Sequence, residues 1–364
     1  MALRLPARAF LTGRAFPRSG LSPPRHFSAS PRSTMRIATL QLSPKLGDFE
    51  GNVQRADEIL NTARATSQGA SSLPGIHNWK PELLVLPELA LTGYNFPSLD
   101  AIRPHLEPAG TGRSAVWARK TAQRLQCKVC VGYPEIEGEG NSEKYYNSLI
   151  VVDEQGEVVH NYRKCFLFFT DDTWAHEGNV ERGFKELSFP GRAEPNISTS
   201  FGICMDINPY KFEAPFTAFE FASRVLGSKS QLVILSMAWV STHEREAYDA
   251  LQGGQDEDAF HWWLQRLSPL LRRKMQHARN LDGAGGDKRI VIVFANRTGS
   301  EPATDPEKPP TLFAGTSTIL AVSQREGSEG LNVEIPLWDQ LGASEEGVCF
   351  ADTTAEPELV FGIA

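Results

Sequence analysis

The sequence predicts an α/β fold in which two β-sheets are each covered by helices. From residue 35 onward, short segments with the period of a strand alternate with segments in which apolar residues recur at helical spacing. Two helix-covered sheets accommodate this number of buried strands and amphipathic helices. The 364 residues, 41% of them hydrophobic, are enough for one large domain, and no internal repeat is evident.

The first half of this region alternates strands and helices. Residues 35–42 alternate polar and apolar side chains as a strand does, and 83–87 form the short apolar run of a buried strand. Gln155-Gly156 separates two strand segments and predicts a hairpin turn. The predicted elements are strand 35–42, helix 53–63, strand 83–87, helix 115–125, strand 128–133 and hairpin strands 148–153 and 157–162.

The second half is predicted to add four strands and a helix. Residues 241–288 have the character of an insertion, and within them Trp262 to Leu271 form an apolar helical segment interrupted by Pro269. We expect this segment to pack against the core; a membrane-surface or partner-binding role is the alternative. The predicted elements are strand 198–204, helix 216–226 and strands 231–238, 289–295 and 317–322.

The first 34 residues have a composition of their own. They contain six arginines and several serines, and no Asp or Glu occurs before Asp48. This pattern is typical of a mitochondrial transit peptide, and 25–30 resembles a matrix-processing site; a basic tail or an unused leader is the alternative. Initiation at Met35 would give a complete cytosolic form. We therefore expect a targeting leader at 1–34 and one domain at 35–364, with an insertion at about 241–288.

The remaining chain is acidic. Without the six leader arginines, 31 basic residues face 44 acidic ones, a formal charge of −13, against −7 for the whole sequence. An acidic surface does not favour a nucleic-acid partner. No apolar run reaches the roughly 18 residues of a membrane-spanning helix, so no membrane span is expected. Five cysteines, an odd number, suit a reducing compartment.

Three segments place a reactive side chain where a predicted strand gives way to a loop, the position from which rigid scaffolds present catalytic groups. In the first, an apolar run leads into Pro87-Glu88. Burial would raise the pKa of the Glu88 carboxyl and make it a competent proton acceptor. Many such glutamates only cap or pair a neighbouring group, so this segment alone leaves both interpretations open.

The other two segments carry a lysine and a cysteine. Lys164 precedes the apolar residues 165–168; it is either solvated or able to stabilise a thiolate or an oxyanion. Cys204 lies at a predicted tight turn, where Gly202 permits a close backbone approach. A buried cysteine is more often a small hydrophobic residue than a nucleophile.

Taken together, the order Glu88, Lys164, Cys204 resembles the nitrilase superfamily of carbon–nitrogen hydrolases, whose catalytic triad has that order. The resemblance covers nearly all of 35–361 and includes the later motifs Met237-Ala238-Trp239, 295–299 and 313–317. It implies a four-layer α-β-β-α sandwich and two copies that can pair as a homodimer. It also implies that Glu88, Lys164 and Cys204 are catalytic.

Within the superfamily, residues 202–212 and Ala214-Pro215-Phe216 resemble the fungal protein N-terminal amidases, as does the Trp- and Leu-rich insertion. This implies a cysteine amidohydrolase that converts N-terminal Asn and Gln of peptides or proteins to Asp and Glu, releases ammonia and feeds the N-degron pathway. Asn208 replaces the arginine of commoner branches, which counts against a small-molecule ω-amidase. That enzyme or a carbamoyl-amino-acid hydrolase is the alternative, and a catalytically silent binding protein is a second one.

The resemblance also implies a mechanism and supporting residues. Glu88 would take the proton of Cys204, which forms a thioester acyl-enzyme, while Lys164 and the N–H of Met205 hold the oxyanion. Neither a metal nor a cofactor is expected. Cys127 and Cys130 form a C-x-x-C pattern, but they lie in a predicted strand and no second pair occurs at zinc spacing.

Three further residues are candidates for the site. Glu177 is expected to support the triad, with a surface carboxylate as the alternative. Asp206 either binds the α-ammonium of the substrate or, as we favour, accepts backbone N–H bonds in the turn after Cys204. Tyr94 either lines the pocket or packs beneath it.

Overall fold

The computed structural model describes residues 35–64, 70–190, 192, 195–277, 288–328 and 330–363. The predicted leader at 1–34 lies outside the described residues, as does the end of the predicted insertion at 278–287. Within the described ranges the chain forms two seven-stranded sheets and one two-stranded sheet. No helix in this part of the chain combines the length and the apolar character needed to cross a membrane.

The first sheet has the strand order β15-β1-β2-β4-β5-β6, with β3 beside β4. Strands β1, β2 and β4 run parallel, so their carboxyl ends lie at one edge of the sheet. Strand β15, the last but one in the chain, pairs antiparallel with β1 at the edge of this sheet. The strands are β1 Arg36–Gln41, β2 Leu83–Val85, β3 Glu107–Pro108, β4 Lys128–Glu137, β5 Lys144–Val152, β6 Val158–Arg163 and β15 Gly347–Asp352.

The second sheet has the order β16-β14-β13-β10-β9-β8-β7. Its parallel strands β8, β9 and β10 also end at a common edge. The strands are β7 Phe184–Ser188, β8 Asn196–Ile203, β9 Leu232–Met237, β10 Lys288–Asn296, β13 Thr318–Gly327, β14 Gly330–Gln340 and β16 Leu359–Ile363. The short strands β11 Ser300–Glu301 and β12 Thr311–Leu312 form a separate pair.

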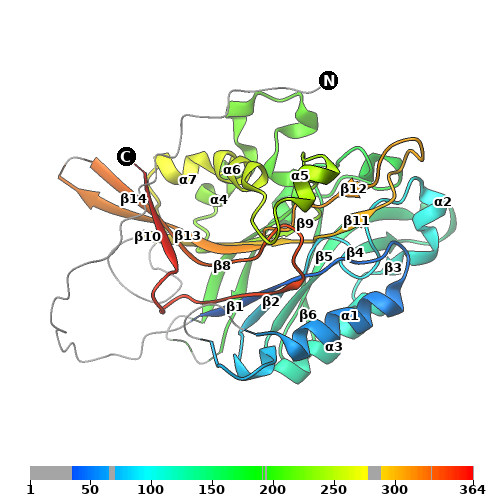
Figure 1. The fold of residues 1–364 in the computed structure, drawn as a ribbon, viewed down its shortest axis with the longest axis horizontal. Coiled ribbons are helices and arrows are strands. Elements are labelled where there is room, and N and C mark those ends of the chain that lie inside the picture. The colour runs from blue at the N-terminus through cyan, green and yellow to red at the C-terminus, as the bar shows by residue number, and fades with distance from the viewer. Residues whose placement is uncertain are drawn as a thin grey trace.

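Helices cover the outer face of each sheet (Figure 1). Helices α1 Phe49–Thr62 and α3 Arg113–Leu125 lie against the first sheet, and α4 Glu220–Gly227, α6 Glu257–Arg266 and α7 Ser268–Arg272 lie against the second. Each longer helix buries one face, such as Phe49, Ala56, Ile59 and Leu60 of α1. The short helices α2 Leu99–Ile102 and α5 Arg245–Asp249 lie in connections.

Side-chain alternation along β1 and β2 separates two cores. Ile37 and Val85 join the core between the sheets, whereas Ala38 and Leu84 join the core under α1 and α3. Successive strand residues point to opposite faces, so a strand buried on both faces contributes to two layers. The expected four-layer α-β-β-α sandwich is therefore the observed fold.

In the second half of the chain, one predicted helix is interrupted, and the predicted insertion packs as expected. The predicted helix 216–226 is broken: a 3-10 turn at Phe216–Ala218 ends at Phe219, whose φ of 47° is left-handed, and α4 begins at Glu220. The apolar part of the insertion packs into the core, with Trp263 and Leu270 fully buried. Trp263 stacks on Phe294 of β10, with ring centroids 5.0 Å apart.

Candidate active site

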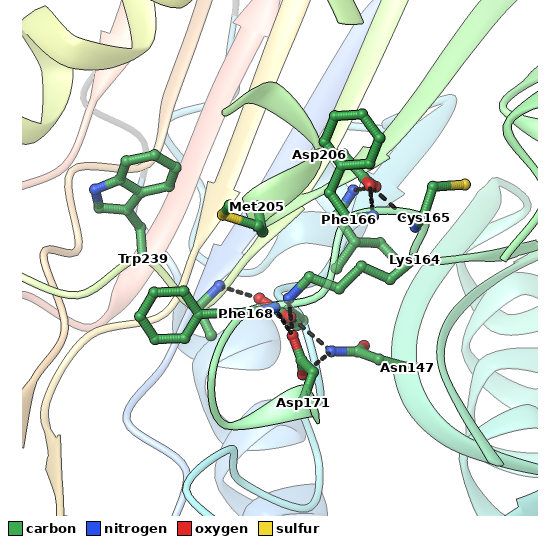
Figure 2. A network of polar contacts seen from close by, with 12 residues as sticks. Asn147, Lys164, Cys165, Phe166, Phe168, Asp171, Met205, Asp206 and Trp239 are labelled. Atoms are coloured by element: carbon green, nitrogen blue, oxygen red, sulfur yellow. Dashed lines mark hydrogen bonds and ion pairs between the residues drawn. The ribbon is translucent and has the colours of Figure 1, made fainter. Parts of the chain in front are cut away.

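Glu88, Lys164 and Asp171 form a fully buried charge cluster. It lies where the carboxyl ends of the parallel strands of one sheet meet those of the other. The Lys164 Nζ lies 2.6 Å from Glu88 Oε1 and 2.5 Å from Asp171 Oδ2. Asn147 Nδ2 donates to both carboxylates, at 2.7 Å to Glu88 and 3.0 Å to Asp171. Figure 2 shows the Lys164 side chain reaching Asp171, which Asn147 also contacts. All four side chains are closed off from solvent, so their charges are weakly screened.

The position of Glu88 depends on the strand beside it. Glu88 follows β2 by three residues, and Ala90 N–H donates to the carbonyl of Gly132 in β4. A Cβ on Gly132 would lie 2.6 Å from the Pro87 carbonyl oxygen and 2.7 Å from Glu88 Cα. Only glycine at 132 therefore lets the chain carrying Glu88 cross this strand. Glu88 Oε2 in turn accepts the N–H of Ala238, just after β9, which ties the two sheets together.

Lys164 and Cys204 also follow strands directly. Lys164 comes after β6, and its N–H donates to the Asn147 carbonyl at 2.8 Å. Cys204 comes after β8 and begins the 3-10 turn Cys204–Ile207. Its φ of 41° is left-handed, a conformation that costs a non-glycine residue free energy and is often found at functional sites. A Cβ on Gly202 would meet Phe221 and Leu235 at 2.7 and 2.8 Å, so the close approach expected at Gly202 is present.

The three predicted triad residues influence one another electrostatically. Burial raises the pKa of Glu88, the Lys164 charge works against this rise, and the Asp171 charge adds to it. Burial also disfavours the charge on Lys164, but Asp171 and Glu88 outweigh it and raise the pKa of Lys164 above its ordinary value. Burial and the Glu88 charge raise the pKa of the Cys204 thiol, while Lys164 lowers it. The resting site therefore holds a neutral thiol, a charged lysine and a carboxyl suited to accept a proton.

Asp171, which the sequence analysis did not single out, occupies the supporting position. Glu177 is exposed instead and accepts a hydrogen bond from the Tyr210 hydroxyl at 2.8 Å, so its expected contact with the triad is absent. The reason is local: the turn Asp171–Thr173 folds Asp171 back, and Phe168 N–H donates to Asp171 Oδ2 at 2.9 Å. The only sequence signal was an acidic residue seven positions after Lys164.

Asp206 has a structural environment rather than a substrate-facing one. It is fully buried; its Oδ1 accepts the N–H groups of Cys165 and Phe166, and its Oδ2 accepts the Ile203 N–H and the Tyr162 hydroxyl. These four donors saturate the carboxylate. The α-ammonium role is therefore wrong, and the favoured structural role fits the geometry: Asp206 joins the Cys204 turn to the segment after Lys164.

Tyr94 lies inside the site. Its ring is 5.6 Å from Lys164 Nζ and packs edge-on against Phe313 at 6.3 Å. Its buried hydroxyl lies near the Asp171 carboxylate. Burial, together with the nearby charges of Asp171 and Glu88, raises the pKa of Tyr94 well above its usual value. The Tyr94 ring thus lies against the charge cluster, with its hydroxyl near Asp171 and Glu88.

Met205, the candidate oxyanion donor, is the second residue of the turn that Cys204 begins, and it is buried. The first N–H groups of a helical turn have no acceptor within the turn, so this one is suited to meet an oxygen near Cys204. No group of three or more His, Cys, Asp or Glu residues within the described ranges is arranged to hold a metal ion. Cys127 and Cys130 are buried free thiols, and burial raises the pKa of Cys127 to about 12.

The chain is similar to known amidases. A family model described as carbon-nitrogen hydrolase matches residues 36–209. A protein N-terminal amidase of Schizosaccharomyces pombe is 31% identical over 303 residues, which cover 80% of this chain and 92% of that protein. The fold is similar to crystal structures of an N-terminal amidase with an Asn-Glu-Ala peptide and with a Gln-Val peptide. Each structure has a TM-score of 0.67 and is 22% identical in sequence. The first match covers 92% of this chain and the second covers 91%, and each covers 99% of the matched chain.

The family model covers the two segments that carry Glu88 and Lys164 and the segment that carries Cys204. The S. pombe relative extends the similarity across most of both chains. The solved structures, at their low identity, bear on the fold alone, and the first of them matches it over 92% of this chain. Sequence and fold agree: this chain belongs to the carbon–nitrogen hydrolase family of amide-cleaving enzymes.

Proposed function

We propose that this chain is a cysteine amidohydrolase that removes the side-chain amide of N-terminal Asn and Gln in peptides and proteins. The observation that carries the proposal is the buried Glu88–Lys164 contact beside Cys204. It occurs in a chain that is 31% identical to the S. pombe protein N-terminal amidase over 92% of that protein. The products are N-terminal Asp or Glu and ammonia, and such N-termini feed the N-degron pathway.

In the first step, Glu88 takes the Cys204 proton and the sulfur attacks the carboxamide carbon. Glu88 Oε1 is occupied by Lys164 and Asn147, whereas Oε2 accepts only the Ala238 N–H and keeps a lone pair for the proton. The S–C bond forms, and the carbonyl π electrons move to oxygen. Lys164 and the Met205 N–H hold this oxyanion; losing one such donor typically costs about 3–4 kcal/mol of barrier.

In the second step, the C–N bond breaks and Glu88 returns its proton to the leaving nitrogen, which departs as ammonia. Glu88 then takes a proton from water as the water oxygen attacks the thioester carbon. The S–C bond breaks, Glu88 returns this proton to the Cys204 sulfur, and the product acid leaves the free enzyme. While Glu88 is protonated it no longer balances the Lys164 charge. Asp171, 2.5 Å away, keeps Lys164 paired throughout the cycle.

The burial of the site supports a side-chain amide as the substrate. Glu88 and Lys164 are fully closed off, and Cys204 is only 8% exposed. A backbone amide in mid-chain carries a residue on each side and cannot enter so enclosed a site. The short carboxamide arm of Asn or Gln can enter it while the peptide stays outside.

Mass spectrometry of Asn-led and Gln-led peptides tests the proposal. We expect the mass gain of an amide replaced by an acid, with a free α-amine, and equimolar ammonia. Free glutamine and α-keto acid amides, assayed in parallel, test the small-molecule alternative, and faster turnover of these would reject the peptide substrate. Cys204→Ala removes only the sulfur, so ammonia release should stop while the thermal unfolding midpoint stays near wild type.

The leader at 1–34 directs one form of the chain to mitochondria, and initiation at Met35 yields a cytosolic form. The support is the arginine-rich, acid-free composition before Asp48. Both forms keep Met35, whose N–H donates to Thr353 Oγ1. Fractionation followed by N-terminal sequencing should find a cleaved mitochondrial form, and uncleaved protein confined to the cytosol would reject the leader. Light scattering of the purified chain tests the homodimer.

A further inference from the structure

Two phenylalanines with unusually exposed rings lie on the segments that flank the site. Phe169 is 67% exposed and Phe212 is 44% exposed, and their rings stack with centroids 5.9 Å apart at 30°. Phe168 contacts both rings, at 5.0 Å from Phe169 and 6.5 Å from Phe212. Adjacent exposed apolar side chains, unlike isolated ones, are typical of a surface that binds a ligand or another protein. We call Phe169 and Phe212 the aromatic pair.

The aromatic pair is continuous with the charge cluster. Phe168 N–H donates to Asp171 Oδ2, the atom that contacts Lys164. The Phe168 ring is half-buried and packs against a cluster that contains Tyr94 and Ala238, whose N–H binds Glu88. Figure 2 draws Phe168 with Lys164, Asp171 and Trp239 in the same close view. Phe168 therefore contacts Asp171, the partner of Lys164, through its backbone N–H, and contacts the exposed ring of Phe169 through its own ring.

The backbone holds Phe212 outward at a cost. Lys211 and Phe212 have left-handed φ values of 53° and 55°, in a turn spanning Tyr210–Phe212. Such residues persist only where the surroundings enforce them, and they cluster at functional sites. Tyr210 enforces this turn: its hydroxyl donates to Glu177, its N–H donates to Glu220 Oε1, and its ring packs against Phe166 at 5.0 Å. The exposed Glu177 thus has a part in fixing the turn beside Phe212.

We propose that the aromatic pair binds the side chain of the second residue of the substrate, the one that follows Asn or Gln. This inference rests on the proposed function. The enclosed site admits the carboxamide arm, and we assign the Phe168 side to the rest of the peptide, because Phe168 contacts both the charge cluster and the aromatic pair. Stacked aromatic rings favour apolar and aromatic side chains, because ring–ring and ring–methyl contacts add to the burial of apolar surface. Second residues such as Phe and Leu are preferred over Gly and Ser.

The test compares peptides of the form Asn-X-Ala-Lys with X as Gly, Ser, Leu or Phe. The readout is the ratio of kcat/KM for X = Phe to that for X = Gly, measured for wild type, Phe169→Ser and Phe212→Ser. We expect the wild-type ratio to exceed one and each variant to lower it by about tenfold, mainly through KM. Phe184→Ser is the matched control, because Phe184 is an exposed phenylalanine (38%) on β7, outside these segments.

The outcomes separate the two proposals. Absence of turnover on every Asn-led peptide by wild-type protein overturns the proposed function and this inference with it. If the peptides are turned over but neither variant changes the ratio of kcat/KM for X = Phe to that for X = Gly, the proposed function stands. The inference about the aromatic pair is then overturned. An altered oligomeric state in the variants with an unchanged ratio would instead identify a second copy of this chain as the occupant, and so would also overturn the inference.

Discussion

Asp171 Oδ2 lies 2.5 Å from the Nζ of Lys164, seven residues earlier in the chain, and both side chains are fully buried. Burial alone would lower the pKa of Lys164, and the Asp171 carboxylate is the largest of the influences that raise it. Because Glu88 exchanges a proton during the proposed cycle and Asp171 does not, Asp171 is the constant partner of this lysine. It is a positioning residue: its effect on the reaction passes through Lys164.

Replacing Asp171 with Asn keeps an acceptor for the Phe168 N–H and removes one negative charge. We expect the pKa of Lys164 to fall, the alkaline limb of the kcat/KM profile to move to lower pH, and turnover at pH 8 to fall roughly tenfold or more. The neighbouring Asp172→Asn is the control, because Asp172 is exposed. An Asp171→Asn profile that overlays wild type would mean that Asp171 does not sustain the lysine charge.

The raised pKa of Glu88 predicts where activity is lost in acid. The base must be ionised, so kcat/KM falls as pH drops through the pKa of Glu88, which burial raises above its usual value of about 4.3. Asp171 contributes to this rise, and Asp171→Asn should therefore shift the acid limb to lower pH. Stopped assays between pH 4 and 8 measure the acid limbs of wild type and Asp171→Asn, and assays above pH 8 measure their alkaline limbs. An acid limb at the ordinary carboxyl position, unmoved in Asp171→Asn, would assign the base to another group.

The sequence reveals the parts of the site that follow strands. Glu88 and Cys204 each come after a short apolar segment, and Lys164 comes just before one; the structure brings these three segments together. Asp171 could not be predicted in this way, because the loop that carries it has no periodic pattern of apolar residues. Burial alone distinguishes it from exposed Asp172 beside it. Glu177, the candidate that the family resemblance suggested, lies beyond that turn.

The same limit applies to the fold. Strand β1 could be predicted from alternation and β2 from its apolar run, but the pairing of β15 with β1 could not, because the two strands are distant in the chain. The contact between Met35 and Thr353 at the end of this pairing joins residues 318 positions apart. No local pattern specifies such a partner. The break at Phe219 is likewise set by the tertiary position of the following helix rather than by its own apolar spacing.

Gly132 should matter for activity although it touches no substrate. Gly132→Ala places a Cβ 2.6 Å from the Pro87 carbonyl oxygen and so displaces the backbone that carries Glu88. We expect a loss of about 1–3 kcal/mol in the free energy of unfolding, and a larger than tenfold loss of kcat as Glu88 leaves the reach of Cys204. Urea unfolding and steady-state kinetics measure the two effects.

Gly227→Ala is the matched control for this substitution. A Cβ there meets no atom within 4 Å, and Gly227 ends helix α4, where alanine is the better helix former. Its activity and unfolding free energy should stay at or slightly above wild type. If Gly132→Ala and Gly227→Ala lose equal amounts of kcat and of unfolding free energy, the position of Glu88 does not depend on the absence of a side chain at residue 132.

His160 predicts an acid-sensitive step in stability. The residue is 8% exposed on β6, its ring lies 4.8 Å from that of Phe201, and burial lowers its pKa to about 4. An unfolded histidine titrates near pH 6.5, so below that pH the unfolded chain binds the extra proton and the folded chain does not. The contribution of His160 is therefore fully present above about pH 6.5 and is lost as pH falls toward 4. By pH 5 this loss is about 2 kcal/mol.

His160→Phe keeps a ring beside Phe201 and removes the titrating group. Between pH 7 and pH 5, its free energy of unfolding should fall by about 2 kcal/mol less than that of wild type. His261→Phe, at an exposed position on α6, is the control and should retain the wild-type dependence. Chemical unfolding at several pH values provides the comparison. If the His160→Phe and wild-type curves stay parallel across this range, the histidine is protonated equally in the folded and unfolded chains, and its burial among Phe201 and its neighbours carries no penalty for charge.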